Sequence, residues 1–256
     1  MRTLLSLLLL ALAVTGCAYP RRSTFMHPAP LALVKIDDRP KNLWTLRVIS
    51  AELPQFKATG LPWDSDGTEP DPFVRILIDK RLVWESPVRE NTRRPEWNFT
   101  LPKNIELSDS SSFRVALWDR DTAVSADPAG ADTHTGLPAS ALPDAIARLS
   151  LDNLGTVSIM VTAPRAQQGV GLRFEVRPDA LIVLEVERYS PAARAGIKVG
   201  ERIVAIGPQR VSELGGNEAT SDLSLASERG SVLTIADAQK HERQVTLDKG
   251  FIWLVM

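Results

Sequence analysis

Cysteine and histidine are scarce in this chain of 256 residues. Cys17 is the one cysteine, so no internal disulfide can form, and the three histidines, His27, His134 and His241, are far apart in the sequence. No G-x-S-x-G, H-E-x-x-H or G-x-x-x-x-G-K pattern occurs, which removes the common signatures of hydrolases and phosphate-binding loops. We therefore expect a protein that is not an enzyme.

An excess of charge of one sign is also lacking, since 30 basic and 31 acidic side chains leave a net charge of −1. That balance provides no electrostatic basis for binding nucleic acid. Hydrophobic residues make up 44% of the chain, enough for hydrophobic cores, and a chain of 256 residues is typical of two domains. Any function that depends on charge must therefore come from local clusters.

The first 17 residues form a unit of their own. Arg2 precedes an apolar run at 4–14, too short to span a bilayer comfortably, and small residues lead to Cys17, as in a bacterial secretory signal peptide. Val14-Thr15-Gly16-Cys17 resembles a lipobox, which implies that Cys17 is acylated, as in palmitate-modified lipoproteins, and anchors the chain. By the sorting rule of such lipoproteins, Ala18 implies the outer membrane of a bacterial cell envelope. The alternative is a plain secretory signal with an incidental cysteine.

Residues 18–41 contain four prolines and no hydrophobic periodicity, so we expect a tether between the lipid and the first domain. From 42 to 164, short segments rich in aromatic and β-branched residues alternate with turn signals, and only 142–149 has a helical pattern. This spacing predicts a mainly β fold, an antiparallel β-sandwich.

Two acidic turns stand out in the predicted sandwich, the first being "LPWDSDGTEPDPF" at 61–73. Together the turns hold six candidate metal ligands: Asp64, Asp66 and Asp71 in the first, and Asp119, Asp121 and Asp127 in the second. Loops at one end of a sandwich converge, and clustered carboxylates repel one another unless a cation neutralises them. All-oxygen ligands at irregular geometry suit Ca2+ better than Mg2+, and a lack of Cys or His argues against zinc and copper. The paired turns predict a Ca2+ site.

The motifs in this segment resemble those of a C2 domain, the calcium-dependent membrane-docking β-sandwich. The matching motifs are Asp71-Pro72-Phe73-Val74, Arg94-Pro95-Glu96-Trp97-Asn98, with Arg94 replacing the usual Asn, and the trio Asp119, Asp121 and Asp127. The resemblance implies two Ca2+ ions and contact with phospholipid, with Trp63 either inserted in a membrane or packed beneath its loop. The usual spacing of the first-loop ligand falls on Ser65, so Asp64 and Asp66 both stay open. A sandwich of this fold that binds no metal is the alternative.

Residues 167–256 are predicted to form a second domain after a short linker at 164–168. Ser190 and Pro191 start a short helix that Gly196 ends, 217–229 has an amphipathic helical pattern, and the other segments are strand-like.

This segment resembles a PDZ domain through Gly169-Val170-Gly171-Leu172, Ser190-Pro191-Ala192-Ala193-x-Ala195-Gly196 and Ile197-Lys198-Val199-Gly200-Glu201-Arg202-Ile203. The resemblance implies a partly open β-barrel with two short helices, to which a protein C-terminus or extended peptide adds as a strand. The implied contacts are Val170, Gly171, Leu172, Arg173 and Phe174. A purely structural role is the alternative, and the apolar residues 251–256 are expected to lie in a groove or to complete the sheet.

These features predict an envelope-anchored lipoprotein with a C2-like domain at 42–164 and a PDZ-like domain at 167–256. We expect a non-enzymatic adaptor that localises a protein partner at the envelope surface. Two alternatives stay open: a regulatory subunit of an envelope protease or secretion system with a calcium-free C2-like domain, and a calcium-dependent phospholipid-docking protein with a passive second domain.

Overall fold

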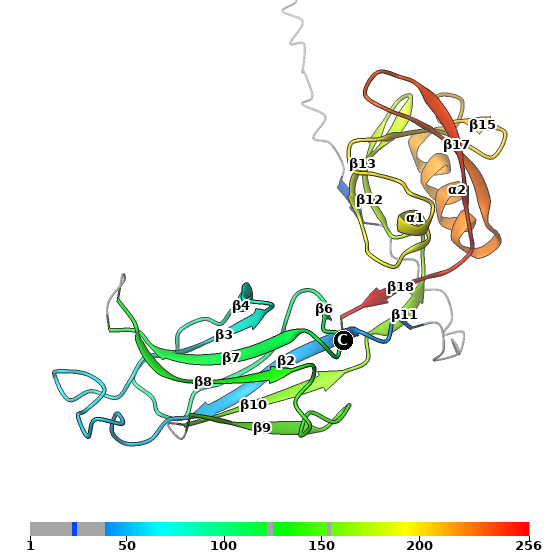
Figure 1. Ribbon diagram of the computed structural model, residues 1–256. Helices are drawn as coiled ribbons and strands as arrows, with labels where there is room; N and C mark the ends of the chain where they lie inside the picture. The colour runs from blue at the N-terminus through cyan, green and yellow to red at the C-terminus, as the bar shows by residue number, and fades with distance from the viewer. Residues whose placement is uncertain (1–21, 25–38, 122–124, 153–154, 256) are drawn as a thin grey trace, which may run out of the picture.

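The computed structural model describes residues 22–24, 39–121, 125–152 and 155–255 (Figure 1). Cys17 and most of the tether lie outside these residues, so the lipid anchor stays a prediction. Within them no helix combines the length and the apolar character that a membrane-spanning helix needs. The fold is mainly β with antiparallel sheets, as the sequence predicts.

The first unit is a sandwich of two antiparallel sheets. One sheet has the order β5-β2-β10-β9, formed by Glu96–Thr100, Leu43–Glu52, Gly155–Thr162 and Ile146–Leu151, with β6 (Ile105–Glu106) pairing on β2. The other has the order β4-β3-β7-β8, formed by Arg81–Glu85, Pro72–Ile78, Ser112–Asp119 and Asp127–Thr135. Figure 1 shows the two sheets as stacked layers whose loops project at both ends.

Alternating apolar residues build the core between these sheets. Phe113, Val115 and Leu117 in β7 are fully buried, and they face the same side because strand side chains alternate with a period of two. The helix predicted for 142–149 is wrong, and the same period of two explains why. Ala147, Leu149 and Leu151 alternate between exposed neighbours, so this segment pairs with β10 as strand β9.

The second unit is a sheet covered by two short helices. The sheet order is β1-β12-β13-β14-β16-β17, formed by Arg22–Thr24, Leu172–Arg177, Ala180–Val186, Arg202–Ile206, Ser231–Ala236 and Glu242–Leu247, with β15 (Gln209–Arg210) on β14. Helix α1 (Pro191–Arg194) is capped by the Ser190 side chain, which accepts a hydrogen bond from the Ala193 amide. Helix α2 (Gly216–Arg229) buries Ala219, Leu223 and Ala226. The assignment of this unit to the PDZ fold stays a prediction.

The segment predicted as a linker is a strand. β11 (Arg165–Gln168) pairs with β18 (Phe251–Leu254), so the apolar C-terminal segment completes a two-stranded sheet between the units. Ile252 is buried there and lies against Gly169, where its side chain approaches the position of an added Cβ to 3.2 Å. The Asn104 side chain also donates to the Trp253 carbonyl, at 2.7 Å, which ties the first unit to this junction.

Candidate functional site

Strand register brings the two acidic turns to one end of the sandwich. In the β3–β7 pairing, Pro72 lies opposite Asp119, so Asp71 reaches the end of β7. On the other side of β7, Asp127 lies opposite Asp119. The Asp71 amide donates to the Asp119 carboxylate, with 2.7 Å between nitrogen and oxygen. The convergence expected from the sequence is therefore built by two neighbouring strand pairs.

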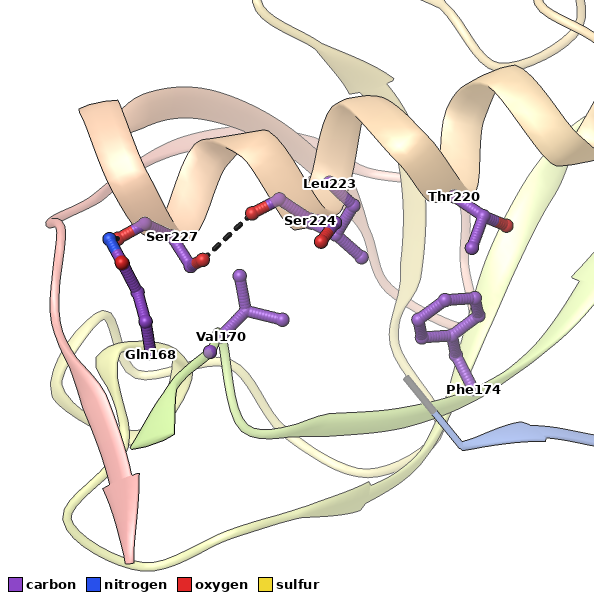
Figure 2. Close-up of a pocket in the computed structure, with 8 residues that line it drawn as sticks. Gln168, Val170, Phe174, Thr220, Leu223, Ser224 and Ser227 are labelled. Carbon is purple, nitrogen blue, oxygen red and sulfur yellow. Dashed lines mark hydrogen bonds between the residues drawn. The ribbon is translucent and has the colours of Figure 1, made fainter. Parts of the chain in front are cut away.

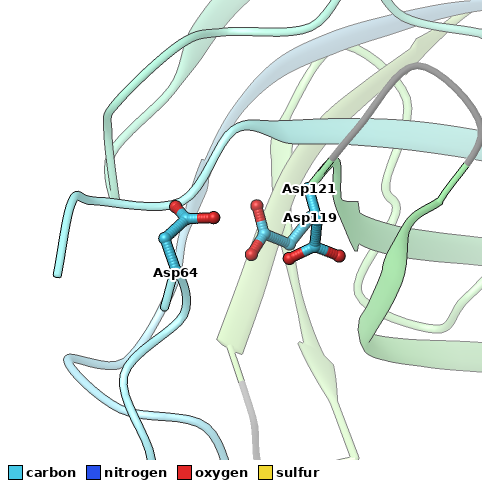
Figure 3. A group of neighbouring side chains, drawn as sticks. All are labelled: Asp64, Asp119 and Asp121. Atoms are coloured by element: carbon cyan, nitrogen blue, oxygen red, sulfur yellow. The ribbon is translucent and has the colours of Figure 1, made fainter. Parts of the chain in front are cut away.

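Three of the six predicted ligands form one cluster, which Figure 3 shows with Asp64 facing the other two. Asp64, Asp119 and Asp121 each offer a carboxylate oxygen, and these atoms all lie within 4.8 Å of one another. Asp64 comes from the first turn, whereas Asp119 and Asp121 come from the end of β7 and just beyond it. The structure thus places Asp64, and not Asp66, beside the second turn.

Asp119 is the buried centre of this cluster. Its exposed fraction is 0%, and its Oδ2 atom has no hydrogen-bond partner among the described residues. Burial raises the pKa of Asp119 to about 6, and repulsion from Asp64 and Asp121 adds to the shift. Burial likewise raises the pKa of Asp64. A buried carboxylate oxygen without a partner is costly, so the geometry favours a cation at this point.

The remaining three predicted ligands have other partners. Asp66 is exposed and accepts hydrogen bonds from the amide and hydroxyl of Thr68, at 3.0 and 2.7 Å. Asp71 accepts from the Asn91 amide at 2.7 Å. Asp127 pairs with the Lys57 ammonium at 2.6 Å. Asp71 and Asp127 stay next to the cluster, whereas Asp66 closes its own turn.

A second candidate site lies between β12 and α2 in the second unit (Figure 2). A pocket with a volume of about 10 Å³, close to the space of one water molecule, is lined by Gln168, Gly169, Val170, Phe174, Thr220, Leu223, Ser224 and Ser227. Figure 2 shows Val170 and Phe174 pointing toward α2. Of the five residues predicted to contact a peptide, these two line the pocket.

The other three predicted peptide contacts have structural roles. Gly171 has a φ of +74°, and an added Cβ would lie 2.1 Å from the Ser190 Cβ, so only glycine fits. Leu172 is buried in the core, and Arg173 pairs with Glu185 at 3.1 Å. The edge of β12 is not free either, because β1 pairs with it in the register Ser23 to Phe174.

Comparison with known proteins bears on the sandwich. The family model described as "C2 domain" matches residues 49–138. This segment is similar to C2 domains. The match spans both acidic turns and all six aspartates, and a C2 domain by itself is non-catalytic. No curated protein matches the chain.

Several solved structures are similar to this chain. One described as a C2 domain is 17% identical, covers 47% of this chain and 96% of its own, and has a TM-score of 0.36. A C2 domain of plant Extended Synaptotagmin 1 is 17% identical, with coverages of 48% and 96% and a TM-score of 0.34. A calcium-bound pair of C2 domains from Extended-Synaptotagmin 2 is 18% identical, with coverages of 51% and 48% and a TM-score of 0.38.

Trp63 lies in the first acidic turn of the C2-like unit. Its side chain is 3% exposed and its indole N–H donates to the Pro54 carbonyl at 2.9 Å, so it packs beneath the loop and does not project from it. Phe56 and Leu61 are instead exposed in this loop, by 49% and 62%. Sequence reasoning missed both, although large apolar side chains between turn residues were a usable signal.

Proposed function

We propose that the C2 domain binds Ca2+ between its two acidic turns and uses the occupied site to dock on phospholipid. The observation that carries this proposal is the fully buried Oδ2 of Asp119, which has no hydrogen-bond partner in the described part of the chain and lies beside the Asp64 and Asp121 carboxylates. Carboxylate oxygens from two separate turns suit the large and irregular coordination shell of Ca2+. No step of this proposal needs a catalytic group.

Calcium binding would act by removing repulsion within the cluster. The carboxylates of Asp64 and Asp119 repel each other when ionised, which contributes to the raised pKa of Asp119. Asp64, Asp119 and Asp121 would hold the cation, whose charge would offset that repulsion and attract the phosphate oxygens of a lipid headgroup. Phe56 and Leu61 lie exposed in the same loop as Asp64, where their apolar surfaces suit the membrane interface.

Calorimetry with Ca2+ and Mg2+ tests the metal site. We expect heat of binding and a higher melting temperature with Ca2+, weaker effects with Mg2+, and loss of both in Asp119→Asn. Asp66→Asn is the matched control, because Asp66 lies outside the cluster and accepts its hydrogen bonds from Thr68 of its own turn. Equal calcium binding by wild type and Asp119→Asn would refute the assignment.

We further propose that the second unit is a PDZ-like module that binds a protein C-terminus. The pocket between β12 and α2 and the glycine-only conformation of Gly171 support this role. Because Arg22–Thr24 pairs along β12, an incoming strand has to displace that segment. Because the pocket has a volume of about 10 Å³, the groove must also widen.

A library of C-terminal peptides tests this module on the full chain. We expect a subset of sequences to bind, and their C-terminally amidated copies to lose binding, since the amide removes the terminal carboxylate. Binding that is equal for acid and amide forms, or a flat result across the library, would reject a carboxylate-reading groove.

The proposal also includes the place of the protein in the cell. We propose that Cys17 carries the lipid that anchors the protein to the bacterial envelope, at the outer membrane, where the two modules act as an adaptor for a protein partner. Metabolic labelling with palmitate tests the anchor: label should enter the wild type and be absent from Cys17→Ser.

A further inference from the structure

A lysine that the sequence analysis did not single out lies at the acidic cluster. The Lys57 ammonium is 2.6 Å from the Asp127 carboxylate and lies over the Trp63 ring, 5.8 Å from its centroid. Lys57 lines the same open pocket as Asp64 and Asp121, a pocket of about 530 Å³. A positive charge of the chain itself therefore occupies one side of the proposed calcium site.

Backbone hydrogen bonds of its loop hold Lys57 in this position. Its backbone N–H donates to the Leu61 carbonyl at 2.9 Å, and its carbonyl accepts from the Gly60 amide at 2.8 Å, which closes a tight turn. Trp63 is buried beneath the same loop, with its ring below the Lys57 ammonium. The Lys57 side chain is 24% exposed, so water screens the ion pair less than it screens a fully exposed one.

We propose that Lys57 is an internal counter-ion that holds Asp127 and limits this C2 domain to one tightly bound Ca2+. The ion would bind at Asp64, Asp119 and Asp121, and the Lys57 ammonium takes the place of a second ion beside Asp127. This inference rests on the proposed calcium site and sharpens it, because the family resemblance alone implies two ions.

Charge explains why the second ion is disfavoured. An ammonium and a divalent cation within a few ångströms repel each other, so a second Ca2+ must displace the lysine from Asp127 before it can use that carboxylate. One Ca2+ and one ammonium carry three positive charges against the five carboxylates of the cluster and its neighbours, so the lysine lowers the negative charge that a second ion would meet. The five are Asp64, Asp71, Asp119, Asp121 and Asp127. We expect this competition to weaken a second site by about tenfold or more.

Calcium titration calorimetry on the full chain tests the inference with two substitutions at one position. Lys57→Gln removes the charge and keeps a polar side chain, whereas Lys57→Arg keeps the charge and is the matched control. We expect one tight site in the wild type and in Lys57→Arg. In Lys57→Gln we expect a second bound ion, or a second dissociation constant at least tenfold lower than in the wild type.

The outcomes separate this inference from the proposed function. If Lys57→Gln and wild type bind the same number of ions with the same affinities, or if the wild type already binds two ions tightly, the counter-ion role is wrong and the calcium site stands. If no variant binds calcium, both proposals are wrong. Circular dichroism spectra and melting curves in EGTA identify any variant whose fold has changed.

Discussion

Replacing Asp119 with asparagine should stabilise the calcium-free protein while abolishing its calcium binding. Asparagine keeps the oxygen that accepts a hydrogen bond from the Asp71 amide at 2.7 Å. It also replaces the unpartnered Oδ2 of Asp119 with an NH2 group, which can donate to the Asp64 or Asp121 carboxylate beside it. The variant thus removes a buried charge that only a cation would compensate.

The magnitude follows from the pKa of Asp119, which burial raises from 3.8 to about 6. Because this pKa is higher in the folded than in the unfolded chain, stability falls as pH rises between those two values. Above pH 6 the ionised carboxylate destabilises the fold by roughly 3 kcal/mol. The asparagine side chain avoids that loss, so the melting temperature of Asp119→Asn should rise by on the order of 10 °C at pH 7.

Unfolding in urea and by heat, with EGTA or with Ca2+, measures this effect. In EGTA the free energy of unfolding of Asp119→Asn should exceed that of the wild type by the full amount at pH 7. The difference should shrink toward pH 4, where Asp119 of the folded wild type is protonated. Calcium at one hundred times its dissociation constant should stabilise the wild type by about 2.7 kcal/mol and leave the variant unchanged. A variant that is less stable than wild type in EGTA at pH 7 would contradict the reasoning.

Three further predictions concern the loop and the second unit. The double variant Phe56→Ser, Leu61→Ser should keep the wild-type melting temperature to within about 2 °C, since both side chains are exposed. It should reduce calcium-dependent sedimentation with anionic vesicles at least fivefold. Unchanged sedimentation would exclude these side chains from docking. Gly171→Ala should destabilise the second unit by more than about 2 kcal/mol in urea, because its φ is +74° and the new Cβ meets Ser190; unchanged stability would argue against the glycine requirement. Ser23→Pro removes a backbone N–H from β1 and should tighten peptide binding by severalfold; equal affinity would show that β1 does not compete.

The pattern of short strands sufficed to predict most of the sandwich. Strands bury alternate side chains, as Phe113, Val115 and Leu117 do, so a period of two and frequent turn signals identify them without knowledge of their partners. The same reasoning failed at 142–149, where a short segment carries too few apolar positions to separate a period of two from one of 3.6. Pairing with β10 decided in favour of a strand.

The pairing of the predicted linker with the C-terminal segment could not be predicted from the sequence. Arg165–Gln168 is polar and short, and nothing in its sequence indicates that it pairs with Phe251–Leu254, a segment far along the chain. The backbone N–H and C=O groups of a strand can form hydrogen bonds with any neighbouring strand, whatever its sequence. This pairing therefore depends on where the two folded units bring the ends of these segments together.

Sequence alone determined that six aspartates lie in two turns, because residue types and spacing are local properties. Which carboxylates meet was decided only by tertiary structure, through the β3–β7 and β7–β8 registers that bring the turns together. Those registers leave Asp66 bonded within its own turn and place Lys57 against Asp127. They also bury Asp119, whose Oδ2 has no partner among the residues that the structure describes. Electrostatic energy depends on distance and burial, and both arise only when segments far apart in the sequence pack together.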